Sequence, residues 1–282
     1  MNRFSLYIVS VRNLLRVALL TLAQLWLLST ASAQLVLYDN FSKKTIDPTK
    51  WEGWQDTDTT LRETIRELTP TPRNYDDNRL HLSQRVYSAV TDDNGGSGGA
   101  WGLKFPNPAA ITAISFTVAV NRANVTACST NSDLNVTNAE FRGNFFNVQS
   151  SATSSIGDVL AEIGINRYAT DTSTSLTVSG FVNECADQFC GSQTNLAYQE
   201  LGTVSLGSTN TLSLQWDQPN HRFIFRLNNG NPVFEPYSVS DSTPPFFAQK
   251  GIDLARVVPN CTSTPRPSAF IDAYFDNVYV NP

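Results

Sequence analysis

Carboxylate, guanidinium, amide and phenol side chains lie an even number of positions apart in three stretches of this sequence. The stretches are 140–148, 158–168 and 221–228, and the recurring residues are Glu140, Arg142, Asn144, Glu162, Asn166, Tyr168, Arg222 and Arg226. A β-strand places alternate side chains on one face, so within each stretch these residues share a side and apolar residues take the other. If the three strands belong to one concave sheet, their polar sides line a groove suited to a hydroxyl-rich ligand.

Glu140 and Glu162 are the candidate pair for catalysis in this groove. Retaining glycosidases use two carboxyl groups about 5.5 Å apart, which flank the bond that is cleaved. These two glutamates lie on different predicted strands, so an acid pair would have to form across strands. The alternative is that all of these polar residues form the solvated face of an ordinary antiparallel sheet.

Alternation with period two predicts ten β-strands and no long helix. The stretch 60–68 fits a helix and a strand almost equally, and the glycine-rich "DDNGGSGG" before Ala100 is typical of a turn. The predicted strands are 35–41, 79–87, 111–120, 140–148, 158–168, 175–183, 198–205, 211–217, 221–228 and 270–280. So many strands in one domain predict an all-β, two-sheet antiparallel sandwich or jelly roll.

Residues 1–33 have the features of a secretory signal peptide. Three arginines precede a mostly apolar run, and a small-residue cleavage pattern ends at Ala33. A retained membrane anchor is the alternative, but the run is shorter than the roughly 20 residues that a membrane span needs. We therefore predict a secreted protein, extracellular or periplasmic, in which residues 34–282 form a single domain without a membrane span.

The charge of the predicted mature chain argues against nucleic acid as a partner. Cleavage after Ala33 removes three arginines and no acidic residue, which changes the net charge from −5 to −8. No basic stretch remains that would follow a phosphate backbone. Four N-x-S/T sequons would be glycosylation sites only in a eukaryotic source, at Asn40, Asn124, Asn135 and Asn260.

Four cysteines follow the predicted signal peptide, at positions 128, 185, 190 and 261. An even number of cysteines in a secreted chain predicts two disulfides, for which three pairings are possible. We favour Cys185 with Cys190, because they are close enough for a local loop, and hence Cys128 with Cys261. Zinc binding is the alternative, although the C-x4-C spacing lacks a second cluster.

The two ends of the predicted domain and one central hairpin carry a resemblance. "LYDNFSKKTIDPTKWEG" (37–53) opens the domain, "FDNVYV" (275–280) closes it, and "LSLQWDQPNHRFIFRLNNG" (212–230) lies between them. These segments resemble strands of the concanavalin A-like lectin/glucanase superfamily, which includes LamG-like domains. The resemblance implies a concanavalin A-like jelly roll in which the first and last strands are neighbours.

The resemblance also implies a structural calcium ion near the chain ends. Several members of the superfamily hold calcium with a carboxylate of the final strand, and Asp276 is the residue at the matching position. Neighbouring end strands would add Asp39 and Asn40, and such oxygens suit calcium. Alternation places Asp276 on the same side as Val278 and Val280. The alternative is that Asp276 accepts backbone hydrogen bonds or pairs with an arginine.

The catalytic motifs of the superfamily are absent from this sequence. Its glucanases carry Glu-x-Asp-x-Glu or a close variant on one strand, and no such spacing occurs here. The histidine and tyrosine-lysine elements of alginate lyases are absent as well. We therefore predict a non-catalytic, lectin-like protein whose partner is a polysaccharide or glycoconjugate. The alternatives are a divergent glycoside hydrolase or polysaccharide lyase, and a structural or adhesive extracellular protein that binds no sugar.

Overall fold

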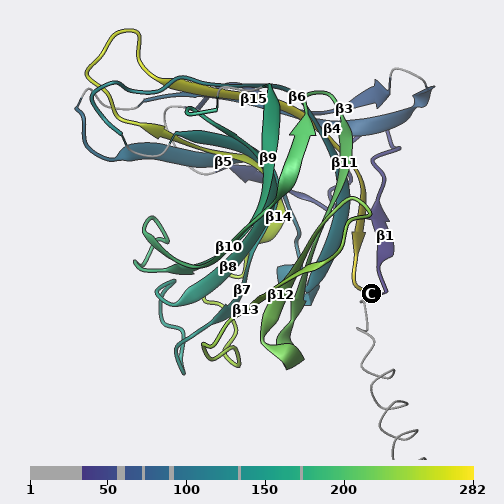
Figure 1. The fold of residues 1–282 in the computed structure, drawn as a ribbon. Coiled ribbons are helices and arrows are strands. Elements are labelled where there is room, and N and C mark those ends of the chain that lie inside the picture. Colours follow the sequence, from purple (N-terminus) through teal and green to yellow (C-terminus); the bar gives the residue numbers. More distant parts are fainter. Residues whose placement is uncertain (1–33, 56–60, 72–73, 89–91, 133–134, 172–173) are drawn as a thin grey trace, which may run out of the picture. The chain divides into compact units, whose positions relative to one another are not determined.

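Two antiparallel β-sheets pack face to face in the computed structural model (Figure 1). The structure describes residues 34–55, 61–71, 74–88, 92–132, 135–171 and 174–282, and the predicted signal peptide lies outside this range. Leu35–Pro282 forms one compact unit. Among the described residues, no helix is long and apolar enough to cross a membrane. The all-β, two-sheet jelly-roll prediction is confirmed.

Sheet A contains both ends of the described chain. Its order is β13 (Val233–Pro236), β12 (Arg222–Leu227), β11 (Thr209–Asp217), β6 (Ala113–Val125), β15 (Ser268–Val280), β4 (Asn74–Tyr87) and β3 (Leu61–Thr71). The first strand, β1 (Val36–Asp39), pairs with the last strand, β15. The neighbouring end strands that the resemblance implied are therefore present.

Sheet B consists of seven strands that come mostly from the middle of the chain. Its order is β10 (Gln193–Ser205), β9 (Ser175–Cys185), β8 (Asp158–Tyr168), β7 (Val136–Asn147), β14 (Lys250–Pro259), β5 (Gly96–Lys104) and β2 (Glu52–Gln55). Two short 3-10 helices, η1 (Pro108–Ala110) and η2 (Gln218–Asn220), connect strands. Because β14 lies between β7 and β5, a late segment of the chain completes the middle of this sheet.

The core between the sheets is rich in phenylalanine. Phe116 and Phe275 of sheet A face Phe141 and Ile163 of sheet B in one apolar cluster, and all four are fully buried. Each of them alternates with a more polar outward neighbour, which is the period-two pattern of a sheet with one buried face. The sequence therefore determines which side of each of these strands enters the core.

The structure corrects the prediction at the glycine-rich segment and resolves the open stretch. Residues Gly96–Lys104 form β5, so glycines that we predicted to be in a turn belong to a strand. The stretch 60–68 lies largely in β3, which excludes the helical alternative for its described residues. The short strands β2 and β13 and the long strand β14 were not predicted.

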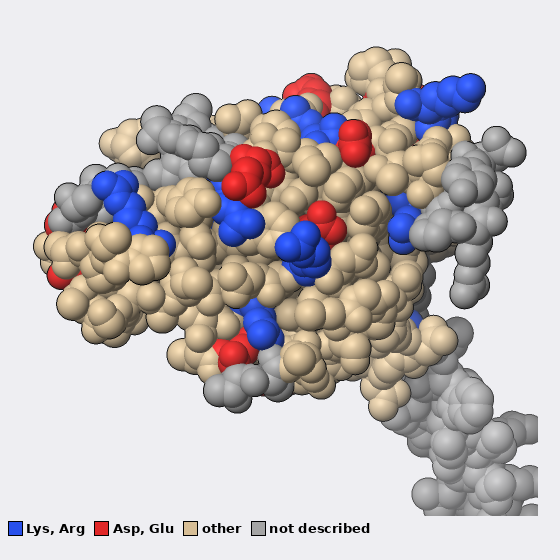
Figure 2. Space-filling view, turned by 90° about the horizontal axis from the view of Figure 1, so that it is seen from above, with Lys and Arg blue, Asp and Glu red and all other residues tan. Residues whose placement is uncertain are grey.

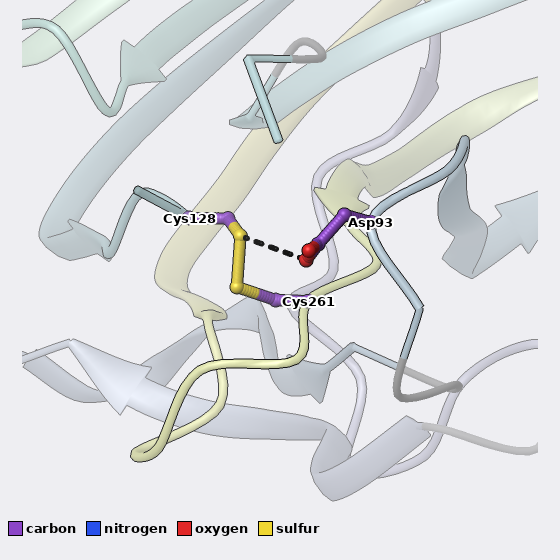
Figure 3. Close-up of side chains that lie close together, drawn as sticks. All are labelled: Asp93, Cys128 and Cys261. Carbon is purple, nitrogen blue, oxygen red and sulfur yellow. Dashed lines mark hydrogen bonds between the residues drawn. A yellow bond between two sulfur atoms is a disulfide. The ribbon is translucent and has the colours of Figure 1, made fainter. Parts of the chain in front are cut away.

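Two disulfides connect the four cysteines in the favoured pairing, which excludes zinc as their partner. Cys128 bonds to Cys261, and Cys185 bonds to Cys190. Figure 3 shows Asp93 beside the first disulfide, where its carboxylate accepts hydrogen bonds from the Thr130 hydroxyl at 2.7 Å and the Thr262 amide at 2.9 Å. Asp93 and the two sulfurs lie close together, but the sulfurs are bonded to each other and are not free thiolates.

Candidate functional site

Three carboxylates meet on the outer face of sheet B. Strands β7 and β8 pair so that Arg142 is opposite Glu162 and Glu140 is opposite Gly164. On the other side of β7, strand β14 places Asp253 opposite Glu140. Directly opposed side chains on one face of a sheet lie about 5 Å apart at Cβ, and diagonal ones about 7–8 Å apart. The cross-strand acid pair Glu140 and Glu162 therefore has Asp253 as a third member.

Arg142 links this acidic cluster to a tryptophan. Its Nε lies 3.0 Å from Asp253 Oδ2 and 3.7 Å from Glu140 Oε1. The guanidinium also lies over the Trp54 ring of β2, 4.4 Å from the ring centre. Asn138 donates a short hydrogen bond to the other carboxylate oxygen, Glu140 Oε2. The arginine and the tryptophan thus pack beside carboxylates that are almost wholly removed from solvent.

Burial and crowding of negative charge favour the protonated form of Glu140. Only 1% of Glu140 and 0% of Asp253 are exposed. Burial raises the pKa of Glu140 well above its usual value, the neighbouring Glu162 and Asp253 raise it further, and Arg142 and Asn138 oppose the change. Burial also raises the pKa of Glu162, against the effect of Arg142. The site therefore contains acids whose environment favours retention of a proton.

Two glycines leave room for the carboxylates. A Cβ at Gly164 would lie 2.8 Å from Glu140 Cβ, and a Cβ at Gly102 would lie 2.5 Å from Asp253 Cβ. Any other residue at either position would displace the opposed acid. Gly164 of β8 and Gly102 of β5 are therefore needed for the two carboxylates to fit at their positions.

Aromatic side chains lie on the same face beyond Glu162. Phe181 of β9 is opposite Glu162, and Tyr198 of β10 is opposite Phe181. The two rings lie 4.9 Å apart between centres, and Tyr198 is 48% exposed. Burial raises the pKa of Tyr168 to about 12, so its hydroxyl remains a hydrogen-bond donor at neutral pH. Sequence reasoning missed Phe181 and Tyr198, because it predicts the strands 175–183 and 198–205 but not their pairing beside 158–168.

Six of the eight predicted groove residues share the outer face of sheet B. Beside Glu140, Arg142, Glu162 and Tyr168, this face carries Asn144, opposite Leu160, and Asn166, opposite Thr177. Asn166 donates a hydrogen bond to Ser179 Oγ at 2.7 Å. A ligand on this face would therefore meet amide, carboxyl, guanidinium and phenol groups.

Arg222 and Arg226 are not part of this face, contrary to the expected single groove. Both belong to β12, which lies in sheet A. Arg222 Nε donates to Asp217 Oδ2 at 2.7 Å, and its guanidinium lies over the Phe234 ring. Alternation along β12 identified its polar side correctly, but alternation within a strand carries no information about which sheet the strand joins.

The three predicted calcium ligands do not fit one ion. Asp39 is buried and accepts hydrogen bonds from the Trp51 indole at 2.8 Å and from the Phe41 amide at 3.0 Å. Asn40 Oδ1 accepts from the Ser42 hydroxyl at 2.9 Å. Asp276 is opposite Thr117, on the outer side of sheet A. The carboxylates of Asp39 and Asp276 thus lie on opposite sides of the sheet.

A β-bulge explains the position of Asp276. Asn277 has a positive φ of 49°, and the register between β15 and β6 shifts between Asp276 and Tyr279. An extra residue in one strand changes which side chains face inward. Phe275 and Val278 are therefore both buried, and Asp276 does not share the side of Val278 as strict alternation predicted.

No family model and no curated protein sequence matches this chain. One similar solved structure is SCLam, a non-specific endo-β-1,3(4)-glucanase of glycoside hydrolase family 16, with 13% identity, 90% of this chain and 93% of that chain covered, and a TM-score of 0.44. A family 16 endo-glucanase from Bacteroides ovatus has 12% identity, coverage of 86% and 97%, and a TM-score of 0.40. Lectin II from Ulex europaeus has 11% identity, coverage of 80% and 97%, and a TM-score of 0.30. Two of these proteins are glucanases and one is a lectin.

Proposed function

We propose that the protein binds a neutral glycan on the outer face of sheet B without cleaving it. The observation that carries the proposal is the convergence of Arg142, Glu162, Tyr168 and Tyr198 on this face from three strands. Hydrogen-bonding groups flanked by aromatic rings are the usual lining of a small-molecule site, and aromatic rings stack on the apolar faces of sugars.

The charge of the site supports a neutral ligand. Three carboxylates surround a single guanidinium, and that guanidinium lies against Asp253 and Glu140. An anionic sugar placed here would find the guanidinium already occupied by these acids. Uncharged hydroxyls, by contrast, accept from Arg142 and Tyr168 and donate to Glu162.

The binding test compares two exposed tyrosines. The protein is applied to an array of plant, algal and microbial polysaccharides, and an oligosaccharide of the strongest hit is titrated by calorimetry. Tyr198→Ala should weaken binding about tenfold, since an aromatic contact contributes up to about 1.5 kcal/mol. Tyr279→Ala removes a 37% exposed tyrosine from sheet A and should leave binding unchanged.

Two results would contradict the binding proposal. Uniform blanks across the polysaccharides would favour a structural or adhesive protein that binds no sugar. Equal effects of Tyr198→Ala and Tyr279→Ala would place the ligand away from sheet B, or show that both changes act through stability. Melting temperatures of both variants distinguish these two causes.

Glycoside hydrolysis is the second candidate, and the raised pKa of Glu140 favours it. A general acid needs a raised pKa, and burial supplies one here. Glu162 would then be the ionised partner across the strands. Binding without cleavage remains our first choice, because Glu140 is only 1% exposed and a catalytic acid must reach the glycosidic oxygen.

The hydrolase candidate is tested by release of reducing ends from the same polysaccharides. If activity is found, Glu162→Gln should abolish it while Glu235→Gln, a change on β13 of sheet A, should not. Retention of full activity by Glu162→Gln would exclude this carboxylate as a catalytic group. If a polysaccharide binds to the protein but no reducing ends are released from it, the hydrolase candidate is excluded for that polysaccharide and lectin-like binding remains.

A further inference from the structure

A hollow of about 270 Å³ opens on the outer face of sheet A, on the other side of the sandwich from the candidate site. Phe270 of β15 forms its floor, between Arg85 of β4 and Asn124 of β6, which are its cross-strand partners. Arg122 of β6 lines the same hollow. Three neighbouring strands therefore contribute the two cations and the ring.

Both guanidinium groups lie against the Phe270 ring. The central carbons of Arg85 and Arg122 lie 4.6 Å and 5.3 Å from the ring centre. Cation–π contact of this kind restricts a long side chain that would otherwise sample many rotamers. A ligand that binds these arginines therefore loses less free energy in ordering them.

The two arginines differ in their charge partners. Arg85 Nε donates to Glu63 Oε2 at 2.8 Å, so one guanidinium is compensated. Arg122 is exposed and forms no ion pair or hydrogen bond within the described part of the chain. Asp272 of β15 is the cross-strand partner of Arg122, but its carboxylate bonds to His81 Nε2 at 2.9 Å. Among the described residues, Arg122 is therefore the guanidinium of the hollow that no carboxylate holds.

The rest of the hollow is neutral. Asn121 and Asn124 present exposed carboxamides, and Leu206 adds an apolar edge that is 38% exposed. Figure 2 shows a face of the molecule on which basic and acidic side chains lie beside one another, without a large field of one sign.

We propose that this hollow binds an acidic sugar unit through its oxyanion, a carboxylate or a sulfate ester. A guanidinium presents paired N–H donors that match such oxygens, the two carboxamides suit the neighbouring hydroxyls, and the volume suits one small ring. The site is separate from the neutral-glycan face of sheet B and does not depend on it.

Glu63 should oppose the binding of an anion at Arg85. Its carboxylate already occupies a donor of Arg85, so it competes with an incoming oxyanion. Glu63→Gln should therefore strengthen binding about threefold, whereas Arg122→Gln should weaken it about tenfold. If general surface charge alone attracted the ligand, loss of any exposed arginine would weaken binding equally, whatever its position.

The experiment is an NMR titration of the isotopically labelled protein with sodium glucuronate, glucose, glucose 6-sulfate and inorganic sulfate. Glucuronate or glucose 6-sulfate should shift the amide signals of residues 121–124 and 270 at millimolar concentration, and glucose should not. Arg226→Gln is the matched control, since Arg226 is an exposed arginine of sheet A that does not line the hollow. The carboxylate and sulfate arms identify which oxyanion is preferred.

Several results would contradict an acidic-sugar site in this hollow. Equal weakening by Arg122→Gln and Arg226→Gln, or no response to either acidic sugar, would overturn it. Inorganic sulfate that binds as tightly as both acidic sugars would overturn the assignment to a sugar. If the unmodified protein binds a neutral glycan on sheet B but neither acidic sugar at the hollow, this inference alone is refuted, because the two sites use different residues.

Discussion

Lys250 is a lysine inside the sandwich, and its burial predicts a pH dependence of stability. It is 3% exposed, its Nζ donates to the Ile111 carbonyl at 2.6 Å, and Nζ lies 4.1 Å from the centre of the Phe145 ring. Among the described residues, no carboxylate forms an ion pair with it. Removal from water without a counter-charge favours the neutral amine.

The magnitude follows from the change in proton affinity. Burial lowers the pKa of Lys250 from 10.5 to about 7. Between these values the unfolded chain binds a proton that the folded chain does not, so the free energy of unfolding rises with pH across this window. With about 1.36 kcal/mol per pKa unit, this group alone adds roughly 2 kcal/mol between pH 7 and pH 9.

Lys250→Met removes the titrating group and keeps a similar apolar stem. At pH 7 the variant avoids a penalty of about 4 kcal/mol, and it loses about 1–3 kcal/mol because the Ile111 carbonyl is left unpaired. We expect the variant to be more stable at pH 7 by roughly 2 kcal/mol and to lose this advantage by pH 9.

The assay is urea unfolding of both proteins at pH 7, 8 and 9. The informative quantity is the difference between the two free energies of unfolding, because other titrating groups contribute equally to both proteins. Lys44→Met, at an exposed lysine, is the control and should show no such trend. Parallel pH profiles for the wild-type protein and Lys250→Met would refute the reasoning.

Three further predictions concern stability. The hydrogen bond that His81 donates to the Asp272 carboxylate raises the pKa of His81 against the effect of burial. The contribution of His81 to stability is therefore full below the unfolded pKa of about 6.5 and declines as pH rises through the folded value. Thermal melts at pH 5.5 and 8.5 should show a larger cost of His81→Gln at the lower pH. Removal of the Cys128–Cys261 disulfide, which spans 133 residues, should cost about 5 kcal/mol in chemical unfolding, against about 2 kcal/mol for the local disulfide. EDTA should leave the melting temperature unchanged, whereas a decrease that Asp276→Ala eliminates would restore the calcium prediction.

Strands whose alternation is undisturbed were predictable from the sequence. The predicted strand 158–168 coincides with β8, and the predicted hairpin of 211–217 and 221–228 is the pair β11 and β12. In these strands apolar side chains enter the core at every second position, so local sequence contains the necessary information. The residues predicted to form the polar sides of β7 and β8 do share one face, for the same reason.

Strand β14 could not be recognised in this way, and with it the third acid of the site was missed. Its buried side carries Lys250 and Arg256 as well as apolar residues, so its sequence does not alternate. A charged residue on the inner face is stable only because of partners and packing supplied by distant segments. Asp253 was therefore overlooked, although it lies opposite Glu140.

The sequence by itself determined the fold class, the favoured cysteine pairing and the faces of regular strands, because these depend on local period and on the number of cysteines. Tertiary structure decided which strands are neighbours. It separated Arg222 from Glu162 by placing their strands in different sheets, and the bulge at Asn277 turned Val278 into the core while Asp276 stayed on the outer side. Pairing between distant strands depends on burial and hydrogen bonding over the whole domain, which no short stretch of residues specifies.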